Sequence, residues 1–190
     1  MWQEILRDFD RRHCHNEHDE IGWFRRQPSL RHSIDRAARA VDARERRYSH
    51  QYRIKRQSIV HARAVLLAAE AQITGALSFD DLLRLITGQL REVRGVGPLY
   101  RYDTTFRIGA YLGLLPTSVY LHAGTRAGAR ALGLAYGKES LEMSEIPAEL
   151  RHRAPHEIEH ILCIYADAFR GNEISAEGCL PTRRNRRVGC

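Results

Sequence analysis

A chain of 190 residues with 43% hydrophobic and 28% charged side chains is long enough for one folded domain with its own core. No apolar run approaches the roughly 20 residues of a membrane-spanning helix, and the first residues lack the pattern of a secretory signal. The four cysteines lack the spacing of a disulfide framework, so we expect reduced thiols, a cytoplasmic location and no membrane partner.

The formal net charge is +7, and Lys55 and Lys138 are the only lysines among 30 basic residues. Arginine presents a planar fork that binds phosphate through two hydrogen bonds, which favours an anionic partner such as nucleic acid. A GC-rich coding sequence, which raises the Arg and Ala content together, is the alternative explanation. The positive excess lies in residues 1–57 and 58–137, because residues 138–190 hold eight basic and nine acidic side chains.

Residues 1–57 are rich in charge and poor in apolar anchors, so we expect a basic N-terminal arm of two or three short helices that packs loosely. Within it, His13-Cys14-His15 and His18 form a possible metal cluster. A structural zinc site needs a second pair of ligands, and none occurs nearby. A solvated charged segment is therefore the favoured interpretation of this cluster.

The predicted helical core covers residues 58–171. An uninterrupted apolar stretch predicts a helix over 59–73, and Ser78 before Asp80-Asp81 has the pattern of an N-cap. Apolar residues then recur at helical spacing until Val93. The segment Arg94-Gly95-Val96-Gly97-Pro98 breaks this helix, and a second one is expected over 99–112, ending at Gly113.

The remaining predicted elements follow the same signals. Residues 119–121 are β-prone, 122–132 form a small-residue helix, and Pro155 begins a last helix that Gly171 ends. Residues 172–190 contain an Arg cluster and few apolar residues, which predicts a flexible tail. The sequence thus predicts an all-α protein, a helical bundle built around a helix-hairpin-helix element, in three segments: 1–57, 58–171 and 172–190.

The segment between the two central helices is the main functional clue. Gly95 and Gly97 would let the chain turn with positive φ, and Val96 would fill the gap between the helices. The amides that follow would lie at a helix N-terminus, where they can bind a phosphate oxygen without reading bases. We therefore expect nucleic-acid binding by a set of ten residues: Arg91, Arg94, Gly95, Val96, Gly97, Leu99, Tyr100, Arg101, Arg107 and Arg126. A plain connector between helices is the alternative.

This stretch resembles the helix-hairpin-helix motif of DNA-repair proteins, and the likeness to helix-hairpin-helix DNA glycosylases covers about residues 82–133. Those proteins follow the hairpin with a helix, a glycine-containing turn and a Val-Asp-x-His segment that opens another helix. Here Gly97, a helix, Gly113 and Val119-Tyr120-Leu121-His122 occur in that order. The resemblance implies a helical fold and binding to the DNA backbone.

The chain departs from that family at the catalytic positions. Tyr120 stands where the family has its catalytic aspartate, Leu99 where bifunctional members have a lysine, and Arg101 where a small residue is usual. The four-cysteine iron–sulfur loop of some members is absent, and we expect no cofactor. The resemblance therefore implies a fold and a binding mode without the usual base-excision chemistry.

Two further groups of residues suggest enzyme chemistry as an alternative. Asp103 and Arg107, spaced i,i+4, could meet His122 and Arg126 in a polar pocket with Asp103 or His122 as catalytic group, as in a divergent glycosylase or lyase. An ion-pair network that joins two helices is the favoured interpretation.

The segment His156-Glu157-Ile158-Glu159-His160 matches the H-E-x-x-H pattern of zinc hydrolases. Glu159 occupies a position that is normally apolar, and no third ligand follows at a familiar spacing. We therefore expect no metal at His156 and His160. The leading expectation is a non-catalytic or divergent nucleic-acid-binding protein, DNA ahead of RNA, with an enzyme or a helical protein-interaction module as alternatives.

Overall fold

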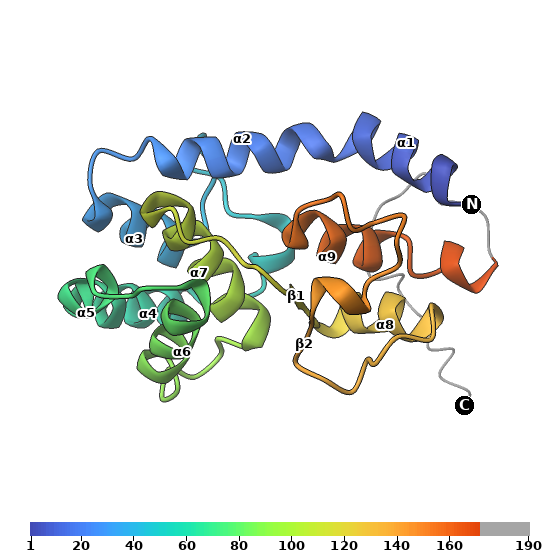
Figure 1. Ribbon diagram of the computed structural model, residues 1–190. Coiled ribbons are helices and arrows are strands. Elements are labelled where there is room, and N and C mark those ends of the chain that lie inside the picture. Colours follow the sequence, from blue (N-terminus) through green and yellow to red (C-terminus); the bar gives the residue numbers. More distant parts are fainter. Residues whose placement is uncertain (172–190) are drawn as a thin grey trace, which may run out of the picture. The chain divides into compact units, whose positions relative to one another are not determined.

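The computed structural model describes residues 1–171, apart from the side chains of residues 14–18. The protein is all-α, as the helical periodicity predicted. Its described residues form nine α-helices, three short 3-10 helices and one two-stranded sheet (Figure 1). Within this part of the chain, no helix is long and apolar enough to cross a membrane. The predicted tail, 172–190, lies outside the described residues.

The chain divides into two compact units. We call residues 8–117 the central unit, and residues 1–7 together with the chain from Ser118 onward the terminal unit. Helix α1 (Trp2–Arg12) contributes residues to both. This division differs from the predicted boundary after residue 57, because most of the expected N-terminal arm belongs to the same unit as the helices that follow it.

The central unit is built around one long helix, α7 (Pro98–Leu112), against which α2, α3 and α6 pack. Its apolar core includes the fully buried side chains of Phe24, Ile34, Leu66 and Ile86. The other elements of this unit are α2 (Cys14–Arg25), α3 (Leu30–Arg39), η1 (Ser49–Gln51), α4 (Arg56–Ala68), α5 (Glu70–Thr74) and α6 (Phe79–Gln89). The single helix expected over 59–73 is therefore two helices that meet at Ala69.

Helix α3 corrects the expectation of a loosely packed arm. Leu30, Ile34 and Ala37 are buried at helical spacing, and the helix packs against both α4 and α7. The Ser29 hydroxyl caps the helix by accepting a hydrogen bond from the His32 amide at 3.3 Å. The segment has few apolar residues, which is why its sequence predicts loose packing. In the structure, however, the apolar residues of α3 face the core.

The terminal unit combines two helices with a short antiparallel sheet. Strand β1 (Val119–Tyr120) pairs with β2 (Ser140–Leu141) in the register Val119↔Leu141 and Tyr120↔Ser140. Helix α8 (Ala123–Ala131) packs against α9 (Pro155–Ile164), and Gly128 lies directly against the backbone of Leu162. Helix α9 ends at Ile164 and not at Gly171, where the last helix was predicted to end, and the separate η3 (Ala168–Arg170) leads to Gly171. The 3-10 helix η2 (Met143–Glu145) follows β2.

Candidate nucleic-acid interface

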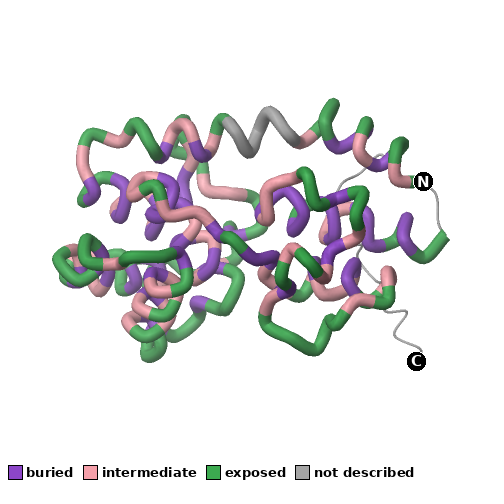
Figure 2. Tube along the Cα trace, in the orientation of Figure 1, coloured by how far each residue is buried: buried purple, intermediate pink, exposed green. Residues whose placement is uncertain are grey.

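The segment from Leu90 to Gly97 joins α6 to α7, and we call it the hairpin. Its three larger apolar side chains, Leu90, Val93 and Val96, are buried. The intervening residues are mostly exposed, as the green connection after α6 shows (Figure 2). Val96 is only 5% exposed and belongs to the core of the central unit, so its expected burial is confirmed. The hairpin is thus held by apolar contacts while its polar backbone and arginines face solvent.

Of the two glycines, only Gly95 adopts a left-handed conformation, with φ of +85°. Gly97 has φ of −95° and ψ of −178°, which is extended backbone open to any residue. The expectation of positive φ at both glycines is therefore wrong for Gly97. Gly95 also lies against α4, since a Cβ placed on it would be 2.7 Å from the Ser58 Oγ. The hairpin therefore packs on the first turn of α4.

We expect Gly95→Ala to lower the free energy of unfolding by about 1–2 kcal/mol, because a left-handed φ costs a residue with a Cβ roughly that amount. Gly97→Ser should cause no such loss, since no atom outside the neighbouring residues lies within 4 Å of a Cβ at this position. Urea unfolding of both variants measures the difference. Equal losses would contradict the assignment of the strained turn to Gly95.

The N-terminus of α7 lacks a side-chain cap. Gly97 is its N-cap and carries no side chain, and Pro98 at the first position has no amide hydrogen. The amides of Leu99 and Tyr100 follow in the first turn, next to the exposed surface of Gly97 and Leu99. In contrast, serine hydroxyls cap α3 and α6. The hairpin therefore ends in amide donors aligned with the positive end of the α7 dipole.

The predicted arginines fall into three environments. Arg91 and Arg94 are exposed beside the hairpin, and Arg91 forms only a solvent-exposed ion pair with Glu92 at 3.2 Å. Arg101 is half-buried and donates from Nη2 to the Leu90 carbonyl at 3.3 Å, which ties α7 to the end of α6. Arg107 is buried, with 3% of its side chain exposed, and cannot present its guanidinium to a phosphate.

The side chain of Tyr100 points into the core and the residue is only 2% exposed, so at most its amide, beside the exposed Gly97 and Leu99, belongs to the candidate interface. The hydroxyl donates to the Ala38 carbonyl at 2.5 Å, and burial raises the pKa of Tyr100 to about 12. The phenol therefore stays neutral and protonated at physiological pH. We accordingly leave the side chains of Val96, Tyr100 and Arg107 out of the surface that a nucleic acid would touch.

Arg107 and Asp103 belong to one polar network inside the central unit. The Arg107 Nε donates to Glu20 at 2.7 Å, its Nη1 donates to Gln51 at 3.1 Å, and its guanidinium stacks 3.9 Å from the centre of the Tyr48 ring. Burial lowers the pKa of Arg107, but Glu20 and Asp103 raise it more, so the net pKa lies above its ordinary value. The same burial raises the pKa of Tyr48.

The Asp103 carboxylate is occupied by two neighbours in the η1 turn. It bonds the His50 ring at 2.9 Å and accepts from the Gln51 amide. Asp103 therefore anchors η1 to α7 through partners that the sequence did not predict. His122 and Arg126, which we expected to share a pocket with Asp103 and Arg107, belong to the terminal unit, so the shared pocket stays a prediction.

Arg126 is engaged with backbone in the terminal unit. Its guanidinium donates to the carbonyls of Leu121 at 2.9 Å and Lys138 at 2.9 Å, and also to that of Tyr136. His122 is the N-cap residue of α8, although its side chain makes no capping hydrogen bond. These contacts give Arg126 a role in fixing the loop before β2, so neither residue enters the interface proposed below.

The zinc-like segment on α9 has a structural use for both of its glutamates. The Glu157 Oε2 accepts from the Ala154 amide at 3.0 Å, and the Glu159 Oε1 accepts from the Tyr120 amide at 2.9 Å. His156 is buried while His160 is exposed. Among the described residues, no three His, Cys, Asp or Glu side chains are arranged to hold a metal ion. The side chains of the other possible cluster, Cys14, His15 and His18, lie outside this description.

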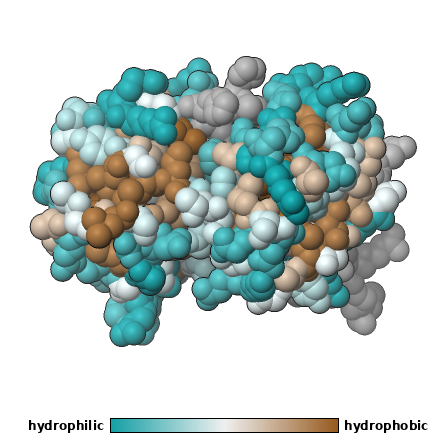
Figure 3. All heavy atoms as spheres, viewed as in Figure 1, coloured by the Kyte–Doolittle hydropathy of each residue, from teal (hydrophilic) through white to brown (hydrophobic). Residues whose placement is uncertain are grey.

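Apolar residues also reach the surface of the central unit. Figure 3 shows them gathered where Figure 1 places α3 and α7, and Leu77, between α5 and α6, is 87% exposed. Such a surface does not attract phosphate, so the exposed arginines and the α7 amides define the candidate interface.

No family model, curated protein or solved structure matches the chain.

Proposed function

We propose that the protein binds nucleic acid, with DNA as the first candidate, by holding the phosphate backbone at the hairpin. The observation that carries this proposal is the exposed α7 N-terminus, which no side chain caps and beside which Arg91 and Arg94 face solvent. Amide donors at the positive end of a helix bind an anion, and guanidinium groups add charge-assisted hydrogen bonds to phosphate oxygens. The sequence likeness to helix-hairpin-helix proteins supports the same mode.

The proposed binding mode determines how the affinity for nucleic acid depends on base sequence and on salt. Backbone amides and arginines that contact phosphates fix position on a strand but do not read bases. We therefore expect affinity with little sequence dependence and a steep decrease with salt, since each neutralised phosphate releases counterions. Catalysis by a divergent glycosylase has less support, because Tyr120 offers no carboxylate and Asp103 is bonded to His50 and Gln51.

The charge-removing variant Arg91→Gln with Arg94→Gln should lower the slope of log affinity against log salt by about 1–2 units, which is roughly 0.9 for each phosphate that the protein no longer neutralises. The matched control is Arg25→Gln with Arg31→Gln, which removes two exposed charges from the same unit. Arg31 pairs with Glu70, which follows the C-terminal end of α4, whereas the hairpin contacts Ser58 in the first turn of that helix. The Arg31 position of this control therefore lies roughly 20 Å from the hairpin.

Fluorescence anisotropy with a labelled duplex at several salt concentrations measures both variants, and single-stranded DNA and duplex RNA serve as comparison probes. The control should keep the slope of the unmodified protein. If the hairpin variant stays folded and binds duplex DNA with unchanged affinity and slope, then the hairpin is only a connector and the proposed function is wrong.

A further inference from the structure

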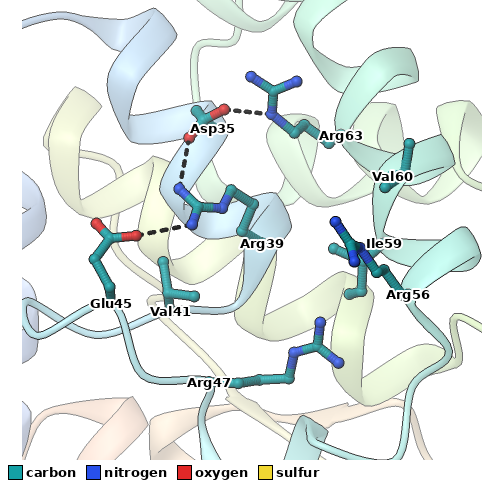
Figure 4. Close-up of a pocket in the computed structure, with 9 residues that line it drawn as sticks. All are labelled: Asp35, Arg39, Val41, Glu45, Arg47, Arg56, Ile59, Val60 and Arg63. Carbon is teal, nitrogen blue, oxygen red and sulfur yellow. Dashed lines mark hydrogen bonds and ion pairs between the residues drawn. The ribbon is translucent and has the colours of Figure 1, made fainter.

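A groove with a volume of about 520 Å³ lies on the central unit beside the first half of α4. One wall comes from Asp35 and Arg39 on α3, and the opposite wall from α4. The turn between α3 and η1 closes one end with Val41, Glu45 and Arg47 (Figure 4). The residues from α4 are Arg56, Ile59, Val60 and Arg63. The groove is thus built entirely within one unit.

The four arginines of the groove differ in how they are paired. Arg39 bonds Asp35 at 3.5 Å and Glu45 at 2.8 Å, and Arg63 also bonds Asp35. These contacts use the only two carboxylates that line the groove. The other two arginines therefore supply a surplus of positive charge.

Arg47 and Arg56 are available to an anion. Arg47 uses its Nη1 to donate to the Ile54 carbonyl at 3.0 Å, which leaves its other N–H groups for a ligand. Arg56 is exposed and forms no ion pair with any of the described residues. Figure 4 shows the guanidinium groups of Arg47 and Arg56 pointing into the same space, over the aliphatic side chain of Ile59.

The groove and the hairpin flank the N-terminal turn of α4 on opposite sides. Like α7, this helix has no side-chain cap, since its N-cap residue is Lys55, and its first turn contains no acidic residue. Ser58 in that turn lies against Gly95 of the hairpin, while Arg56 lines the groove. Helices α4 and α7, neither of which has a side-chain cap, therefore begin close together, with cations on both sides.

We infer that the groove is a second phosphate-binding site, which holds another phosphodiester of the nucleic-acid strand bound at the hairpin. This inference rests on the proposed function. Ser58 and the groove residues lie on different sides of α4, so the two phosphates would be separated by about one helix diameter, roughly 10 Å. Arg47 and Arg56 bind the second phosphate, and Val60, which is 58% exposed, offers an apolar surface to the adjoining sugar.

Arg56→Gln tests the second site. The change should leave the fold intact, because Arg56 has no ion-pair partner among the described residues and lies at the first position of α4, where a positive charge is unfavourable. It should lower the salt slope for duplex DNA by about 0.9 units, which corresponds to one neutralised phosphate. Arg56→Lys keeps the charge and should restore most of the slope, and Arg31→Gln is the distant control.

The outcomes separate this inference from the proposed function. A lower slope in Arg56→Gln and a further decrease when it is combined with Arg91→Gln and Arg94→Gln support one strand across both sites. An unchanged slope in Arg56→Gln, with a lower slope in the hairpin variant, overturns the second site alone. Unchanged slopes in both overturn both proposals. Adenosine monophosphate that binds in an Arg56-dependent way, without any effect of Arg56→Gln on DNA binding, would assign the groove to free nucleotides and overturn the inference.

Discussion

Arg107→Met should lower the free energy of unfolding by about 3 kcal/mol, the lower end of the cost of removing one partner from a buried ion pair, because the Glu20 side chain is 24% exposed. The substitution keeps a long side chain in the core but removes the donors to Glu20 and Gln51. Glu20 lies on α2 and Arg107 on α7, so the change leaves a carboxylate without its counter-ion where these helices pack. Urea unfolding followed by circular dichroism gives the free energy.

A second variant distinguishes the missing ion pair from a poor fit of methionine. Arg107→Met combined with Glu20→Leu removes both charges, and replacing a buried pair by apolar residues is often nearly neutral. The double variant should therefore recover a large part of the stability that the single variant loses. A single variant within about 0.5 kcal/mol of the unmodified protein would show that this network contributes little to the central unit.

Gly128→Val should cost about 3 kcal/mol, at the upper end for overpacking, because the obstacle is backbone. A Cβ at Gly128 would overlap the Leu162 carbonyl, and one at Gly124 would overlap the Cys163 side chain. Helix α9 cannot retreat from α8 without disturbing Glu159, which is buried and accepts from the Tyr120 amide. Close packing of these two helices thus depends on glycine at positions 124 and 128 of α8.

The control for Gly128→Val is Ala123→Val, which places the same β-branched residue at an exposed position of α8. It should change the melting temperature by no more than a few degrees, whereas Gly128→Val should lower it by roughly 10 degrees or more, on the order of 4 degrees per kcal/mol. Similar melting temperatures for the two variants would contradict the close approach of α8 and α9.

Local signals predicted the helix ends well. Ser78 and Gly113 lie where the sequence placed a start and an end, and the β-prone patch at Val119 is a strand. The last helix is an exception, because it ends at Ile164 and not at Gly171. These signals depend on the backbone preferences of single residues, which are the same in any fold. The burial of Val96 was also predicted correctly, because an apolar side chain between two glycines of a tight turn is shielded from water only by packing on the adjacent helices.

Contacts between distant segments could not be predicted. The pair Glu20 and Arg107 spans 87 positions, so Arg107 was expected on the surface although it is buried. The groove depends on a turn at residues 41–47 that brings Arg47 opposite Arg56. The only sequence signal for the groove was the high density of arginine between residues 44 and 56. That density is as typical of a solvent-exposed segment as of a binding site.

The proposed function depends most directly on the open amides at the start of α7, and the pair Gly97→Asp and Gly97→Asn tests them. Both side chains can cap the helix by accepting from the amides of Leu99 or Tyr100, so both variants should be at least as stable as the unmodified protein. A capped N-terminus no longer offers these donors to a phosphate, and the aspartate also repels it.

The decisive measurement is the affinity of these two variants for a labelled DNA duplex at low salt. The account predicts weaker binding by Gly97→Asn and a loss of tenfold or more in Gly97→Asp, on the order of 1.4 kcal/mol, with melting temperatures that do not fall. If Gly97→Asp is stably folded and binds the duplex as tightly as the unmodified protein, with the same dependence on salt, then the α7 N-terminus does not hold the backbone.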